Sequence, residues 1–262
     1  MTDDFPIRVE QRGAVAVWIL DRPDRMNALS RAALVALGKL AREAAVNASI
    51  RAIVVTGAGD KAFCAGADLK ERQSMTDDDV RAQIDLYRSE LGPLDRSPKP
   101  VVAAINGLAL GGGLELALVC DLRVAAAHAE LGLPETSIGI IPGAGGTQRL
   151  PRVVGEGRAK EMILLARRVS AVEALAWGLV NRVTPEGQSV VDDAVAWIRP
   201  IAEGAPIAQA AALEAIDRGA EVPLEIGLAL EKIGYDRTLP SEDRREALAA
   251  FAARRAPKFS GR

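Results

Sequence analysis

The chain has 262 residues, enough for one large domain or for a domain with an appendage. Hydrophobic residues make up 49% but aromatic residues only 3%, so the core must be mainly aliphatic, which favours helices packed tightly on a sheet. With 33 Lys and Arg against 35 Asp and Glu, the net charge of −2 gives no strong field toward nucleic acid or membranes. The single histidine, His128, argues against a multi-histidine metal site and a histidine-based triad, so no metal is expected.

The cysteines and the N-terminal sequence indicate in which cellular compartment the protein is expected. Cys64 and Cys120 lie far apart in apolar surroundings, which predicts free thiols in a cytoplasmic protein. The acidic residues 1–6 contain no apolar run, so no signal peptide is expected. Residues 101–119 approach the length of a membrane span, but their glycines and Glu115 argue against one.

The first half of the chain alternates between strand and helix patterns. Polar and apolar residues alternate over residues 7–20, with a break at Arg12-Gly13, which predicts a β-hairpin. Ser30 is a good N-cap for a helix over residues 31–45. Further strands are predicted at residues 50–56, 101–105 and 121–126, and a helix opened by three glycines at residues 114–119. This alternation implies an α/β core with crossover connections.

Beyond about Gly155, patterns at helical spacing dominate. Six helical segments are predicted, at residues 159–166, 171–177, 190–201, 207–218, 223–235 and 241–254. The chain is therefore expected to comprise an α/β core over residues 1–200 and a helical region over residues 201–262.

The first candidate site segment is residues 61–71, Lys-Ala-Phe-Cys-Ala-Gly-Ala-Asp-Leu-Lys-Glu. Glycine permits unusual backbone angles and alanines let a ligand approach closely, so an N–H group here could donate to an oxyanion. A strand-to-helix loop without a ligand explains the same residues equally well. Cys64 fits a small buried residue better than a nucleophile, and Asp68 could cap the loop or act in catalysis.

The second candidate is Gly111-Gly112-Gly113, which opens an apolar helix. Its N–H groups lie at the positive end of the helix dipole, where a donor to an oxyanion is worth about 3 kcal/mol. Close packing of the helix on a strand is the alternative. The run matches neither a phosphate-binding loop nor a dinucleotide fingerprint.

The third candidate is a pair of glutamates twenty residues apart. Glu115 interrupts an apolar helix, where an unpaired carboxylate is costly, so it must reach solvent, a partner or a functional cleft. Glu135 follows Pro134, and a solvated loop carboxylate is its simplest explanation. Two carboxylates around one water form an acid–base arrangement, so the pair is more informative than either residue.

Three segments, residues 62–71, 104–121 and 133–150, together resemble the enoyl-CoA hydratase (crotonase) family. The resemblance runs from the Asp21-Arg22-Pro23 turn to residues 255–259. It implies an α/β spiral of repeated ββα units, followed by C-terminal helices that drive assembly into homotrimers, with trimers commonly pairing into hexamers.

The resemblance also assigns roles to individual residues. It implies oxyanion-hole donors at Ala67 and Gly112, paired carboxylates at Glu115 and Glu135, and at Gly143 an N–H that helps to place the water. It implies further contacts to the acyl-CoA substrate from Ala65, Asp68, Leu69 and Lys70. No cofactor is expected, because coenzyme A is part of the substrate.

The implied reaction is reversible hydration of a 2-enoyl-CoA, with water added at C3 and a proton at C2. Because the chain keeps both glutamates, it resembles hydratases more than the isomerases, dehalogenases or decarboxylases of the family. Residues 63–72, 112–118 and 140–143 are most similar to methylglutaconyl-CoA hydratases of leucine metabolism, whereas Pro134 is more typical of short-chain (crotonyl-CoA) hydratases of fatty-acid β-oxidation.

A methylglutaconyl group carries an extra carboxylate, which requires a cation near the acyl tail. Arg72 follows the oxyanion loop and is the candidate, with an unrelated surface role as the alternative. Methylglutaconyl-CoA hydratases of animals also bind RNA, through a lysine-rich first helix. The corresponding residues 41–50 are nearly neutral here, so no nucleic-acid partner is expected.

Overall fold

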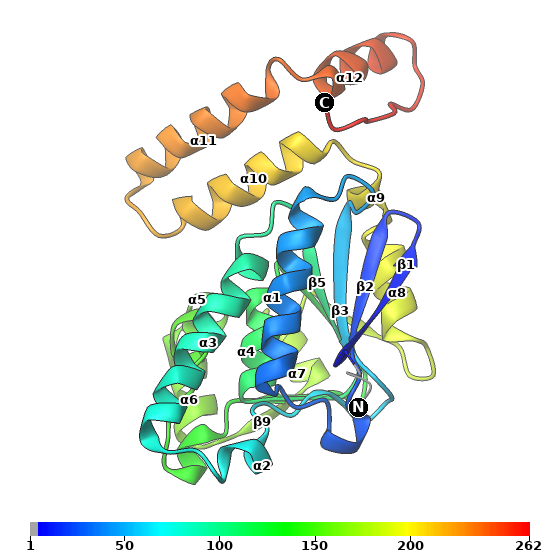
Figure 1. Ribbon diagram of the computed structural model, residues 1–262. Coiled ribbons are helices and arrows are strands. Elements are labelled where there is room, and N and C mark those ends of the chain that lie inside the picture. Colours follow the sequence, from blue (N-terminus) through cyan, green and yellow to red (C-terminus); the bar gives the residue numbers. More distant parts are fainter. Residues whose placement is uncertain (1–4) are drawn as a thin grey trace.

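The computed structural model describes residues 5–262, apart from the side chain of Leu69. Residues 1–4, on which part of the expectation about a signal peptide rests, lie outside the described residues. Two sheets organise the chain, with the helices arranged around them (Figure 1). The six-stranded sheet has the order β1-β2-β3-β5-β7-β10, and the four-stranded sheet has the order β4-β6-β8-β9.

Most neighbouring strands run parallel, as expected for crossover connections. The antiparallel pairs are β1–β2 and β8–β9. The six-stranded sheet comprises β1 (Ile7–Arg12), β2 (Val15–Leu20), β3 (Ala52–Gly57), β5 (Val101–Ile105), β7 (Leu122–Ala126) and β10 (Arg182–Thr184). The four-stranded sheet comprises β4 (Ala62–Cys64), β6 (Leu108–Leu110), β8 (Glu130–Gly132) and β9 (Arg168–Ser170).

The helices follow in chain order, with short 3-10 helices labelled η. Those of the first part are η1 (Pro23–Arg25), α1 (Arg31–Val46), α2 (Leu69–Arg72), α3 (Asp77–Asp95), α4 (Gly112–Val119), η2 (Glu135–Ile138) and α5 (Gly146–Val154). Those of the second part are α6 (Glu156–Leu164), α7 (Ala171–Trp177), α8 (Val190–Trp197), α9 (Arg199–Ala202), α10 (Pro206–Gly219), α11 (Leu224–Thr238) and α12 (Glu242–Ala252).

From β3 to β8, successive strands alternate between the two sheets. The chain passes from β3 to β4 in the other sheet and returns through α2 and α3 to β5, which pairs with β3. β5, β6 and α4 repeat this path and lead to β7, and β4, β6 and β8 pair in parallel. The third unit, β7, β8 and α5, is followed by α6 and by β9, which pairs with β8, before the chain returns to the large sheet at β10. These repeats confirm the predicted spiral of ββα units.

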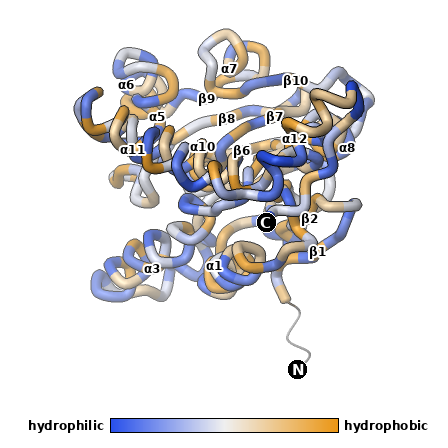
Figure 2. The backbone as a smooth tube through the Cα atoms, turned by 90° about the horizontal axis from the view of Figure 1, so that it is seen from above, coloured by the Kyte–Doolittle hydropathy of each residue, from blue (hydrophilic) through white to orange (hydrophobic). Residues whose placement is uncertain are grey.

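The core is aliphatic, as the composition required. Every residue of β2, β3 and β5 is buried, because both faces of the large sheet are covered. One face packs against α1, α3 and α4, which lie to one side of it in Figure 1, while α8 covers the other face with Val190 and Ala194. Figure 2 shows that α3 is largely hydrophilic and lies at the periphery.

Several predicted elements are confirmed and others were wrong or missing. The hairpin, the helix capped by Ser30 and the strand at residues 101–105 form as predicted, with the Ser30 side chain accepting from Ala33 N. The single helix predicted at residues 190–201 is two helices, because Pro200 fits the first turn of α9 but not a helix interior. Strands β9 and β10 interrupt the region that was expected to be helical.

The last three helices lie at one end of the molecule. Helices α10 and α11 form a hairpin and contact each other extensively, and α12 follows them (Figure 1). The division of the chain at residue 200 stays a prediction. Within residues 5–262, no helix combines the length and apolar character needed to cross a membrane.

Candidate active site

A glycine turn after β4 places the first candidate donor. Gly66 adopts φ +97°, a backbone conformation that L side chains rarely adopt, and an added Cβ would lie 2.8 Å from Leu110 O. Hydrogen bonds to Leu29 hold the backbone on both sides of Ala67. Leu29 N donates to Gly66 O at 2.8 Å, and Asp68 N donates to Leu29 O at 3.3 Å. The N–H of Ala67 is left without an acceptor among the described residues.

The second candidate donor is the first N–H of α4. Gly111 caps this helix with φ +52°, and the N–H of Gly112 has no acceptor in residues 5–262, as expected at a helix N-terminus. A Cβ added to Gly112 would lie 3.6 Å from Ala67 N, so the two amides border one space. The structure therefore brings together the two donors that the resemblance implied.

Glu115 lies one turn into α4 and is only 2% exposed. Its Oε1 accepts hydrogen bonds from Ala144 N and Gly146 N, both at 2.7 Å, at the start of α5. Burial raises the pKa of Glu115, while the N–H groups of Gly146, Ala144 and Gly143 act in the opposite direction by stabilising the carboxylate. The sequence left solvent, a partner or a functional cleft as possible surroundings for Glu115. Its burial excludes solvent, and backbone N–H groups are its partners.

Glu135 is the first residue of η2, and its carboxylate lies beside Gly111. Its Oε1 lies 2.9 Å from the point where a Cβ on Gly111 would stand, so a side chain there would displace the carboxylate. Its Oε2 is buried and has no hydrogen-bond partner in the described part of the chain. Burial and the nearby charge of Glu115 raise the pKa of Glu135 to about 7, although its own N–H and Arg72 oppose the shift. A freely solvated carboxylate is therefore the wrong interpretation.

These groups converge on one cavity of about 220 Å³. The predicted site residues that line it are Ala65, Ala67, Arg72, Gly112, Glu115, Glu135 and Gly143. A second cavity of about 1010 Å³ shares Arg72, Ile84 and Tyr87 as walls and continues between α3 and α5. Together the cavities have room for an extended ligand.

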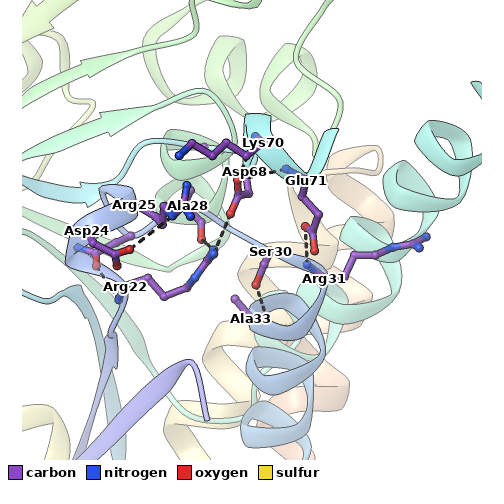
Figure 3. A network of polar contacts seen from close by, with 12 residues as sticks. Arg22, Asp24, Arg25, Ala28, Ser30, Arg31, Ala33, Asp68, Lys70 and Glu71 are labelled. Atoms are coloured by element: carbon purple, nitrogen blue, oxygen red, sulfur yellow. Dashed lines mark hydrogen bonds and ion pairs between the residues drawn. The ribbon is translucent and has the colours of Figure 1, made fainter. Parts of the chain in front are cut away.

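The remaining predicted contacts lie beside this cavity. Figure 3 shows Asp68 directed toward Arg22, whose Nη2 donates to Asp68 Oδ2 at 2.8 Å, while Asp68 Oδ1 accepts from Lys70 N at 3.1 Å. Partial burial opposes ionisation, but the Arg22 contact and the N–H of Glu71 hold the pKa of Asp68 below its usual value. Asp68 thus caps α2, Lys70 is exposed, and the side chain of Leu69 lies outside the described ones.

Two other candidates are structural. Cys64 is fully buried, and burial raises the pKa of its thiol to about 12, so it is no thiolate nucleophile at neutral pH. His128 contacts the carbonyl oxygens of Asp60 and Asn106 through Nε2 at 3.0 and 3.1 Å.

Helix α3 supplies site residues that the sequence analysis missed. Ile84 and Tyr87 line both cavities from this helix, and Gln83 lines a small neighbouring cavity of about 20 Å³ that Tyr87 also borders. Two signals could have found it: Thr76 begins a capping box with Asp79, and apolar residues recur at helical spacing. The recurring residues are Val80, Ile84, Tyr87, Leu91 and Leu94.

The arrangement suits acid–base chemistry beside a carbonyl group. Two converging N–H groups stabilise negative charge on an oxygen placed between them. Nearby, one carboxylate is held by backbone donors and the other has a pKa near neutrality, so the pair can accept and supply protons at the same pH.

Comparisons with known proteins identify relatives of this chain. YngF of Bacillus subtilis (strain 168), whose name assigns it to the enoyl-CoA hydratases/isomerases, is 49% identical over 247 residues, which cover 94% of this chain and 95% of YngF. Human mitochondrial methylglutaconyl-CoA hydratase is 42% identical over 255 residues, which cover 96% of this chain and 75% of the human protein. The crystal structure of an enoyl-CoA hydratase from Bacillus anthracis superposes with a TM-score of 0.95 at 46% identity, covering 98% of this chain and 100% of that one.

The similarity extends over nearly the whole chain. The sequence profile of the enoyl-CoA hydratase/isomerase family matches residues 10–262. With its spiral of ββα units and the paired amides and carboxylates around one cavity, the chain belongs to the enoyl-CoA hydratase/isomerase family.

Proposed function

We propose that the protein is an enoyl-CoA hydratase, which adds water across the 2,3 double bond of a short 2-enoyl-CoA and catalyses the reverse dehydration of a 3-hydroxyacyl-CoA. The observation that carries this proposal is the convergence of Glu115 and Glu135 on the cavity that Ala67 and Gly112 also line. An isomerase needs only to move a proton within the substrate, whereas two carboxylates can also hold and activate a water.

In the proposed reaction, the N–H groups of Ala67 and Gly112 bind the thioester oxygen and polarise the conjugated double bond. Water bonds to C3 while Glu115, whose carboxylate the backbone holds, takes its proton; the π electrons move onto the thioester oxygen as an enolate. Glu135, which is partly protonated near pH 7, then donates a proton to C2. Exchange with solvent restores both carboxyl groups.

Glutamine substitutions test this division of labour. Glu115→Gln and Glu135→Gln should each lower kcat for hydration of crotonyl-CoA by at least ~100-fold, since each removes one proton-transfer group. Hydration is followed by the loss of absorbance of the conjugated thioester. Glu186→Gln, on an exposed loop, is the control. Full activity in either site variant would contradict the two-carboxylate mechanism.

For the acyl group we propose 3-methylglutaconyl, hydrated to 3-hydroxy-3-methylglutaryl, with crotonyl as the alternative. Arg72 supports the diacid, because it lines both the carboxylate cavity and the larger cavity beyond it. Its guanidinium has no ion-pair partner among the described residues, so it is available to an acidic acyl tail. The relationship to human methylglutaconyl-CoA hydratase points in the same direction.

Arg72→Ala separates the two substrates. It should raise KM for 3-methylglutaconyl-CoA by ~10-fold or more, because it removes the cation that pairs with the extra carboxylate, and leave KM for crotonyl-CoA within about twofold. Arg81→Ala, at an exposed position on the following helix α3, is the control. Equal changes for both substrates would contradict a diacid contact at Arg72.

A further inference from the structure

A tyrosine that the mechanism above does not use lies at the centre of the site. Tyr87, on α3, is 4% exposed, yet its hydroxyl has no hydrogen-bond partner among the described residues. Within residues 5–262, the side-chain atoms that are both buried and unpartnered are Tyr87 Oη, Gln83 Oε1, Glu135 Oε2, Arg51 Nη1 and Arg149 Nε. Tyr87 and Glu135 line the candidate active site, which indicates that their unpartnered atoms are directed toward a ligand, and Gln83 lines a small cavity of about 20 Å³ beside it.

The position of the hydroxyl is close to the two amide donors. Tyr87 Oη lies 3.5 Å from the point where a Cβ on Gly112 would stand, and Ala67 N lies 3.6 Å from the same point. Tyr87 also lines the cavity that contains the two glutamates. The hydroxyl, the Ala67 amide and the start of α4 therefore surround one small region.

We propose that Tyr87 donates a third hydrogen bond to the thioester oxygen, beside the N–H groups of Ala67 and Gly112. This inference rests on the proposed hydratase function. The bond strengthens as the oxygen gains negative charge on the way to the enolate, so it lowers the barrier more than it tightens substrate binding. No bond within Tyr87 is broken, and its proton stays on the phenol.

The surroundings keep this phenol in its donor form. Burial raises the pKa of Tyr87, and the nearby Cys64 and Glu115 act in the same direction. Gln83, one helical turn earlier, and the positive charge of Arg72 lower the pKa of Tyr87 but do not reverse the upward shift, and the Gln83 and Tyr87 side chains do not reach hydrogen-bond geometry. Tyr87 therefore stays protonated across the pH range in which the glutamates titrate.

Tyr87→Phe removes the hydroxyl and keeps the ring that fills the core. We expect kcat for hydration to fall at least ~10-fold while KM changes by less than about threefold. The chain has two tyrosines, and Tyr235→Phe, on α11 and outside both cavities, is the control for removal of a phenol hydroxyl. Tyr87→Phe activity within twofold of the unaltered protein would overturn the proposal.

The absorbance spectrum of a bound ligand distinguishes a hydrogen bond from Tyr87 to the thioester oxygen from a purely structural role of Tyr87. Cinnamoyl-CoA carries a conjugated thioester whose absorbance shifts to longer wavelength when its oxygen accepts hydrogen bonds. In the Glu115→Gln background, where hydration is blocked, the red shift should be smaller with Phe at position 87 than with Tyr. An unchanged shift would overturn the contact even if activity fell.

Failure of the proposed hydratase function can be distinguished from failure of the Tyr87 contact. If the unaltered protein hydrates no enoyl-CoA but Tyr87→Phe still reduces the shift, the hydratase assignment fails and the tyrosine contact stands. If the unaltered protein shows no red shift, the contact fails as well. Comparing Gln83→Leu with Tyr87→Phe adds a further check: equal losses of thermal stability with unchanged kcat would identify the two residues as a structural pair and overturn the proposal.

Discussion

At the residue scale, burial makes Glu135 a proton donor near neutral pH but lowers the stability of the folded protein. Its Oε2 is buried without a partner, so the charged form loses hydration that no hydrogen bond replaces. This raises its pKa from the usual 4.5 to about 7. The folded protein therefore binds more protons than the unfolded chain between these two values, and the free energy of unfolding falls as the pH rises through that window.

The stability difference between Glu135→Gln and the unaltered protein should consequently depend on pH. At pH 8 the variant should melt several degrees higher, because the shift costs the unaltered protein up to roughly 3 kcal/mol once Glu135 is ionised. Near pH 4 the two proteins should melt together. Thermal unfolding at both pH values, with Glu186→Gln as control, measures this. A melting difference independent of pH would show that Glu135 has an ordinary pKa.

At the scale of one element, the two glycines that begin α4 have separate functions. A Cβ on Gly113 would lie 2.0 Å from Cys64 O, which is backbone and cannot move aside. A Cβ on Gly112 would meet nothing closer than 3.5 Å and would point into the space between Tyr87 and Ala67. Both interpretations of the glycine run therefore hold, with packing at Gly113 and exposure of a donor at Gly112.

Alanine substitutions should separate these two functions. Gly113→Ala should lower the melting temperature strongly, since overpacking a core typically costs about 1–3 kcal/mol and the clash here is with backbone. Gly112→Ala should keep or slightly raise the melting temperature, because alanine favours the helix, yet lose most hydratase activity by obstructing the oxygen site. Calorimetry and the hydration assay on both variants distinguish them. Similar effects of the two substitutions on stability would contradict this assignment.

At the scale of the whole molecule, the C-terminal helices expose many apolar side chains. Those exposed on α10–α12 include Ile216, Leu224, Ile226, Leu228, Ile233, Tyr235, Leu248 and Phe251. A monomer would leave these groups in water, and contiguous patches of this kind mark interaction surfaces. We propose that these helices assemble copies of the chain into a homotrimer, and trimers into hexamers, as the family resemblance implied.

Charge on this surface should weaken the assembly. The unaltered chain should elute with a mass near three or six times 27.6 kDa, and the double variant Leu224→Glu, Leu228→Glu should shift toward 27.6 kDa. Light scattering after size exclusion measures the mass, and circular dichroism checks the fold. Val46→Glu, at an exposed position at the end of α1, is the control. A monomeric unaltered protein would contradict the proposed assembly.

The sequence by itself determined the aliphatic core, the hairpin, the capped first helix and the two glutamates. These follow from local signals: residue size, alternation over β1 and β2, and the Ser30 cap. The short strands β4, β6 and β8 were missed, because three residues carry too little periodicity and such strands are stable only beside one another. Helix α3 was missed although its capping box and spacing are local.

Only the tertiary structure decided what the candidate residues do. Residues 67, 112, 115 and 135 are separated by up to 68 positions, and the pairing of β4, β6 and β8 brings them to one cavity. The pKa of Glu135 depends on burial and on Glu115, and the Tyr87 hydroxyl is significant only beside the Ala67 and Gly112 amides. The sequence specifies the residue types. The burial of a carboxylate and the distances between residues far apart in the chain are set only when the two sheets pack.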